Sequence, residues 1–102
     1  LRAYIRDNAK NLNKACRTEG WLKERVEQIE AGFPESEEIQ HFSKPDFLQT
    51  LLEHEEKVES LFAECLEKSM TVEAKDLFNS LVKDTRKYIA LLEDRLELEQ
   101  LL

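Results

Sequence analysis

Apolar side chains recur at seven-residue intervals through the first third of the chain. Two interleaved series carry this pattern: Leu1, Asn8, Ala15, Leu22 and Ile29, and Ile5, Leu12, Glu19, Val26 and Phe33. A stripe with this period is typical of a helix that packs against other helices in a bundle or coiled coil. The pattern predicts a helix over residues 1–31, and Gly32 and Pro34 are expected to end it.

Residues 33–45, with the sequence FPESEEIQHFSKP, lose the helical period and hold both prolines of the chain. We expect a long crossover here, because about a dozen residues are more than a tight helical hairpin needs. Such a connection lets the chain traverse the end of a bundle or run along its side.

The helical period returns in two further segments, over residues 46–69 and residues 72–100. Ser43 or Asp46 is expected to cap the first of them and Thr71 the second, because their side-chain oxygens can accept hydrogen bonds from the first turn of a helix. The short break between the segments predicts that the two helices form an antiparallel hairpin.

The apolar positions of this hairpin are expected to face a shared core. They are Leu48, Leu51, Glu55, Val58, Phe62 and Cys65 on the first helix, and Leu77, Phe78, Leu81, Thr85, Tyr88, Leu92 and Leu96 on the second. The predicted fold class is all-α, with three long helices in one domain over residues 1–102. Since three such helices expose more apolar surface than they cover, we expect a second subunit or an upstream helix to complete an up-down bundle. A second subunit would be another copy of this chain, and a homodimer is the expected assembly.

The charge composition of the chain limits the kinds of partner that it is expected to bind. Of the 102 residues, 36% are charged, and the formal net charge is −7 without any cluster of Lys and Arg. Binding through a phosphate backbone or to an anionic membrane relies on clustered cations, so neither nucleic acid nor a membrane is an expected partner. No apolar run is long enough for a membrane span, and no signal pattern is visible, so the expected location is cytoplasmic.

Four polar residues interrupt the apolar stripes: Asn8, Glu19, Glu55 and Thr85. A buried carboxylate is costly unless it is paired, protonated or bound to a metal ion. Glu19 and Glu55 therefore allow two interpretations. In the first they lie at the edge of the stripe and reach solvent or an arginine such as Arg17, Arg25 or Arg86. In the second they are metal ligands, since helical bundles hold metal ions with carboxylates from facing helices.

Two motifs bear on the second interpretation: the phrase KDLFNSLVKDTRKYIALLEDRLE, which begins at Lys75, and the seven-residue spacing of Glu55 and Phe62. With these motifs, residues 51–97 resemble the second helical hairpin of rubrerythrin-like proteins in the ferritin-like superfamily. In that family the first helix of the hairpin carries a ligand glutamate followed seven residues later by an aromatic residue. The resemblance implies a ferritin-like bundle and a ligand role for Glu55.

The sequence departs from the family at its other ligands. The family's Glu-x-x-His pair falls on Thr85 and Tyr88. The segment NKACRTEGWLKERVEQIE from Asn13 aligns without gaps with the segment from Asn79, which places Glu19 at the position of Thr85 and again leaves no histidine. The resemblance therefore implies a degenerate site in which Glu19 and Glu55 bind at most one iron or manganese ion.

The histidines and cysteines add little chemistry. His54 adjoins Glu55 but lies about 100° around the helix from it, so we expect it on an exposed flank and rank it below the glutamates as a metal ligand. His41 is expected to be solvated in the crossover. Cys16 and Cys65 are expected to be reduced and to pack as small apolar side chains.

Three functions remain open at this point. We favour a non-catalytic helical module, a degenerate ferritin-like protein that dimerises and binds a protein partner, with no catalytic residues and no cofactor. The alternatives are a ferritin-like metal-binding protein or oxidoreductase that uses Glu19 and Glu55 with iron or manganese, and a coiled-coil adaptor. Glycine-rich phosphate loops, dinucleotide-binding fingerprints and nucleophile–histidine signatures are absent from the sequence.

Overall fold

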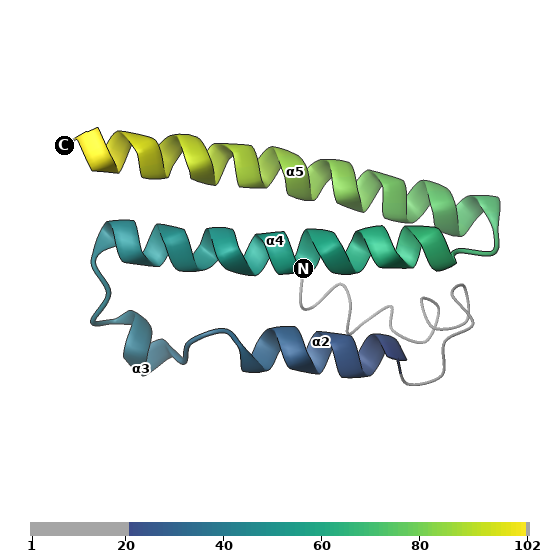
Figure 1. Cartoon of the computed structure of the whole chain (residues 1–102), viewed down its shortest axis with the longest axis horizontal. Helices are drawn as coiled ribbons and strands as arrows, with labels where there is room; N and C mark the ends of the chain where they lie inside the picture. Colours follow the sequence, from purple (N-terminus) through teal and green to yellow (C-terminus); the bar gives the residue numbers. More distant parts are fainter. Residues whose placement is uncertain (1–20, 102) are drawn as a thin grey trace.

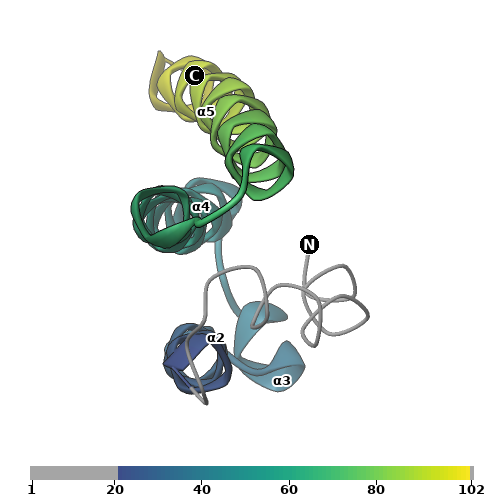
Figure 2. The same cartoon turned by 90° about the vertical axis from the view of Figure 1, so that its right-hand side faces the viewer.

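The computed structural model describes residues 21–101, and this range is helical without any strand. It holds α2 (Trp21–Ala31), α3 (Ser36–Ile39), α4 (Lys44–Lys68) and α5 (Val72–Leu101). The two long helices, α4 and α5, lie side by side and antiparallel, and α2 runs along the opposite side of α4 (Figure 1). The view along the bundle places α4 between α5 and α2 (Figure 2). The all-α class and the predicted hairpin are confirmed, while Asn8, Cys16 and Glu19 lie outside the described residues.

Local sequence signals set the ends of these helices. α2 ends at Ala31, immediately before Gly32, as predicted. The hydroxyl oxygen of Ser43 accepts a hydrogen bond of 3.2 Å from the backbone N–H of Asp46, which confirms Ser43 as the N-cap of α4. Thr71 caps α5 in the same way, because its hydroxyl oxygen accepts a bond of 3.1 Å from the backbone N–H of Ala74. Each cap satisfies an amide that the helix itself cannot pair.

The crossover between α2 and α4 contains a short helix, α3, that the sequence pattern did not indicate. Its single turn is formed by backbone bonds such as the one from Gln40 N–H to the carbonyl of Ser36, at 3.2 Å. Ile39 and Phe42 are half-buried, whereas His41 is exposed, as expected for a solvated loop residue. The turn lets the crossover place apolar side chains against the bundle while its glutamates remain in solvent.

The core consists of two clusters that follow the hairpin. The larger cluster contains Leu22, Val58, Leu61, Phe62, Cys65, Phe78 and Val82. The smaller contains Leu48, Leu52, Ile89 and Leu92. Cys65 is fully buried and packs as a small apolar side chain. Because α2 and α5 both pack on α4, the buried arc of α4 is wider than one seven-residue series, and it includes Leu52 and Leu61, which the predicted stripe had omitted.

One of the predicted core positions on α5 is wrong. Tyr88 was expected to face inward, but 44% of its surface is exposed. The face of α5 that packs on α4 is instead centred on Phe78, Thr85 and Leu92, and it also buries Val82 and Ile89. The error arose because α5 carries apolar residues along two adjacent stripes, and the one that holds Tyr88 is exposed at Tyr88, Leu91 and Leu98.

Trp21 fixes the first turn of α2 against the end of α4. Its half-buried ring packs against the larger core cluster, and the Lys68 ammonium lies 5.2 Å from the ring centroid. One turn further along α2, Arg25 forms an ion pair of 2.9 Å with Glu64 of α4. These contacts combine apolar burial with cation–π and charge-assisted interactions, and they hold α2 on the side of α4 opposite to α5.

Candidate functional site

Glu55, the first predicted metal ligand, lies on α4 and is half-buried. Burial raises the pKa of its carboxyl group above the ordinary value of 4.5, because the charged form loses hydration. The arginines considered as its partners within the described residues bind other carboxylates: Arg25 pairs with Glu64 and Arg86 with Glu59. Glu55 therefore sits at the edge of the apolar stripe without either of these arginines.

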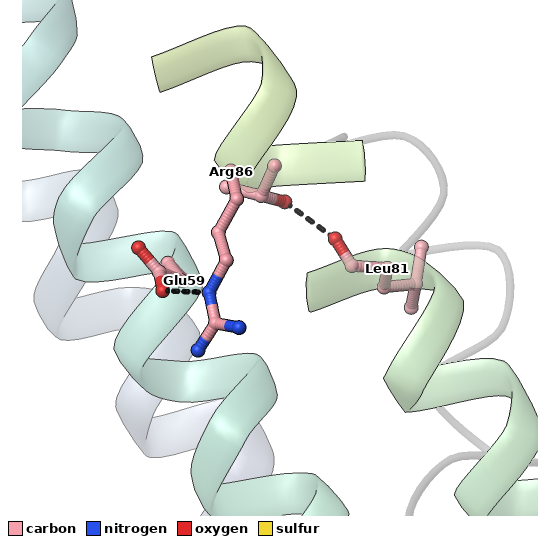
Figure 3. Close-up of polar contacts among 4 residues, drawn as sticks. Glu59, Leu81 and Arg86 are labelled. Carbon is pink, nitrogen blue, oxygen red and sulfur yellow. Dashed lines mark hydrogen bonds and ion pairs between the residues drawn. The ribbon is translucent and has the colours of Figure 1, made fainter. Parts of the chain in front are cut away.

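Thr85 and Tyr88 stand at the two positions that the ferritin-like resemblance assigns to a Glu-x-x-His pair. Thr85 is buried, and its hydroxyl donates a bond of 2.8 Å to the backbone carbonyl of Leu81, which satisfies it locally. Tyr88 points to the exposed side of α5. Next to Thr85, the Arg86 side chain crosses to α4 and donates a bond of 2.7 Å from Nε to Glu59 (Figure 3). The hydroxyl group of Thr85 is thus satisfied by a hydrogen bond within its own helix, without a bound ligand.

His54 is half-buried, which corrects the expectation of an exposed flank. Its ring lies against Phe33, with centroids 4.8 Å apart at an interplanar angle of 59°. The reason is that Phe33, just after α2, folds back onto α4 and covers this flank. Within residues 21–101, no group of three or more His, Cys, Asp or Glu side chains is placed to hold a metal ion. Glu19, the second predicted ligand, lies outside these residues.

A groove of about 700 Å³ opens between α2, α3 and α4. Its apolar lining consists of Val26, Ile29, Ala31, Phe33, Pro34, Ile39, Val58 and Leu61. Glu30, Glu35, Ser36, Glu38 and His54 supply its polar lining. A groove lined by apolar side chains and glutamates suits an apolar side chain or short helix with cationic flanks better than an anionic ligand.

A second stripe of α5 carries three of the exposed large apolar side chains of the described chain. We call it the outer stripe and define it by positions alternately four and three residues apart: Leu77, Leu81, Asp84, Tyr88, Leu91, Arg95 and Leu98. Tyr88, Leu91 and Leu98 expose 44%, 65% and 55% of their surface. Leu77 and Leu81 are half-buried against the larger core cluster, so the stripe is continuous with the core at one end.

Sequence reasoning missed the outer stripe as a site because it merged the two stripes of α5 into one inward face. The signal was nevertheless present. The alternation of four and three residues is the spacing of a helix seam that packs against another helix. Phe78, Thr85 and Leu92 already supply such a seam toward α4, so the additional series was unassigned.

Comparison with known proteins found no matching protein-family model, no similar curated protein and no similar solved structure. Between residues 21 and 101, none of the helices combines the length and apolar character that crossing a membrane requires.

Proposed function

We propose that this chain is a non-catalytic helical module that acts through protein–protein association and forms a homodimer. The observation that carries the proposal is the outer stripe of α5, where large apolar side chains remain exposed on a long, regular helix. Exposed apolar side chains that gather on one face, rather than being scattered singly, mark an interaction surface. The stripe lies on a helix held rigidly by the hairpin core, so its side chains are preorganised for contact.

The remaining features agree with a binding role. The groove between α2, α3 and α4 offers a second surface, lined by apolar side chains and glutamates and suited to a protein partner with cationic side chains. Two polar residues of α5 have structural roles, since the buried Thr85 bonds to its own helix and the exposed Arg86 ties α5 to α4. A coiled-coil adaptor, the third hypothesis, would use the same kind of helix seam as the outer stripe of α5.

The mass of the chain in solution tests this proposal. We expect light scattering coupled to size-exclusion chromatography to give about twice the chain mass of 12.0 kDa at micromolar concentration. A mass that stays at that of one chain across the concentration range would contradict the proposed homodimer.

A second candidate function, binding of iron or manganese by a degenerate ferritin-like protein, is favoured by one observation. Glu55 places a half-buried carboxyl group on the helix where the resemblance expects a ligand, and burial raises its pKa. A bound cation would offset the cost of ionising this carboxyl group. Glu19, the other expected ligand, is outside the described residues.

Metal analysis tests this second function on protein purified without chelator. The metal-binding hypothesis predicts about one ion per chain in the wild type. It also predicts loss of that metal in Glu55→Gln and its retention in Glu56→Gln, a matched change at an exposed neighbour on the same helix. Equal metal content in the two variants would exclude Glu55 as a ligand.

A further inference from the structure

The outer stripe of α5 is self-complementary when it is read in opposite directions. Its residues from position 81 to position 98 are Leu81, Asp84, Tyr88, Leu91, Arg95 and Leu98. A twofold axis between positions 89 and 90 pairs Leu81 with Leu98 at the two ends of the series. It also pairs Asp84 with Arg95, and Tyr88 with Leu91 at the centre. A twofold symmetric dimer requires this type of pattern, because each contact between two residues must occur twice.

We infer that α5 pairs antiparallel with α5 of a second copy of this chain, with the twofold axis between positions 89 and 90. This inference rests on the proposed function and specifies its geometry. In this register Leu81 packs on Leu98 of the other copy, Tyr88 packs on Leu91, and Asp84 forms an ion pair with Arg95. The seam from Leu81 to Leu98 spans about 25 Å at 1.5 Å per residue.

Asp84 and Arg95 favour a second copy of this chain as the partner, and they favour the antiparallel register centred between positions 89 and 90. Asp84 and Arg95 are exposed, and neither forms an ion pair with the described part of its own chain. On an apolar seam each would be costly to cover without a partner, whereas opposite each other they form two charge-assisted contacts. The second copy therefore supplies the group that each charge lacks.

The flank of the seam has the same symmetry. Lys87 and Asp94 lie on the side of the outer stripe that faces away from α4, and both are exposed. In an antiparallel pair of helices, side chains at these flanking positions approach their counterparts on the other helix. The register that joins Asp84 to Arg95 also brings Lys87 near Asp94 of the second copy, which adds two further opposite-charge contacts.

Other pairings of the same helices are disfavoured by charge. A parallel arrangement in register places Asp84 opposite Asp84 and Arg95 opposite Arg95, and like charges at an interface are repulsive. An antiparallel arrangement shifted by one seven-residue repeat in either direction places both charges opposite apolar side chains. The antiparallel register centred between positions 89 and 90 is the one that matches every charged position on the seam.

Charge reversal and mixing test this geometry in the full chain. Asp84→Arg gives two arginines on the seam, and Arg95→Asp gives two aspartates, so each variant alone should repel its own copy. We expect the dimer dissociation constant of each, measured by sedimentation equilibrium, to rise about tenfold or more. An equimolar mixture should restore dimerisation, because positions 84 and 95 are both basic in the first variant and both acidic in the second. Every contact between these positions in the mixed dimer then joins opposite charges.

Two matched variants control for net charge. Glu93→Arg and Lys75→Asp make the same charge changes at exposed positions of α5 that lie off the outer stripe. We expect both to dimerise like the wild type. Circular dichroism at 222 nm should show unchanged helicity in all four variants, because each replaced side chain is exposed.

The possible outcomes separate this inference from the proposed function. Weak dimerisation of each reversal variant and recovery on mixing would support the antiparallel register. Two results would overturn the register while leaving the homodimer in place. One is a dissociation constant in both reversal variants equal to that of the wild type. The other is a mixture that dimerises as weakly as each variant alone. A wild type that is monomeric at every concentration would overturn both.

Discussion

Phe62 on α4 and Phe78 on α5 join the hairpin, with ring centroids 6.4 Å apart at an interplanar angle of 41°. Both side chains are fully buried, and they lie in the larger core cluster beside Cys65 and Leu61. A tilted aromatic pair at this separation adds a specific attraction to the burial of apolar area. Because α5 contacts no other described helix to a comparable extent, α5 is attached to the bundle through its interface with α4, to which this pair belongs.

Removal of one ring tests the importance of that contact. We expect Phe78→Ala to lower the free energy of unfolding by about 3–5 kcal/mol, since it removes apolar burial and leaves a cavity. Urea denaturation followed by circular dichroism measures the change. Val72→Ala, at a position with 70% exposure on the same helix, should change the free energy of unfolding by less than about 0.5 kcal/mol. Comparable losses in the two variants would show that the buried pair does not anchor α5.

Removal of a helix cap should lower the free energy of unfolding by less than Phe78→Ala does. Ser43→Ala and Thr71→Ala each remove a side-chain acceptor from an N-terminal amide of α4 or α5, so each should cost about 0.5–2 kcal/mol. Thermal unfolding of both variants provides the measurement. Ser60→Ala makes the same chemical change at an exposed position inside α4, where alanine favours helix, and it should cause no loss. A destabilisation of similar size in Ser60→Ala would rule out capping as the cause.

Glu55 predicts a dependence of stability on pH. Its pKa is raised in the folded state because burial disfavours the charged form, so the folded chain holds this proton more tightly than the unfolded chain does. The contribution of Glu55 to stability is therefore complete below its unfolded pKa and declines as pH rises through the folded pKa. Glu55→Gln keeps the shape without the charge, and we expect it to raise the melting temperature at pH 7.

Melting temperatures measured across a range of pH show whether the stabilisation by Glu55→Gln comes from removal of the charge of Glu55. The melting temperatures of Glu55→Gln and wild type should converge at pH 4 and below, where the wild-type carboxyl group is also protonated. Glu56→Gln, on an exposed neighbour, should follow the wild type throughout. A lower melting temperature for Glu55→Gln at pH 7 would mean that the ionised carboxylate is stabilising, as a metal ligand or ion-pair partner is.

Helix ends and the hairpin could be predicted from the sequence because their signals are local. Ser43 and Thr71 accept hydrogen bonds from residues three positions further on, and Gly32 follows the last residue of α2. These features need no knowledge of the tertiary structure. The all-α class follows from periodicity in the same way.

The assignment of α5 side chains could not be settled from the sequence because it depends on which neighbours surround the helix. Tyr88 and Ile89 are both apolar enough for a core, yet Ile89 is buried against α4 and Tyr88 is 44% exposed. Likewise, His54 is half-buried because Phe33 returns to cover it, a contact between residues far apart along the chain. The predicted site at Glu19 and Glu55 remains a prediction, since the structure describes the surroundings of Glu55 alone.

We propose that the outer stripe of α5 is the dimer interface, and sedimentation equilibrium of a stripe variant tests this assignment. In Leu91→Gln/Leu98→Gln two exposed leucines become polar, while Met70→Gln/Val72→Gln removes similarly exposed apolar side chains outside the stripe. We predict that the first variant sediments as a monomer at concentrations where the wild type and the second variant are dimers. A dimer of unchanged affinity in Leu91→Gln/Leu98→Gln would contradict the claim.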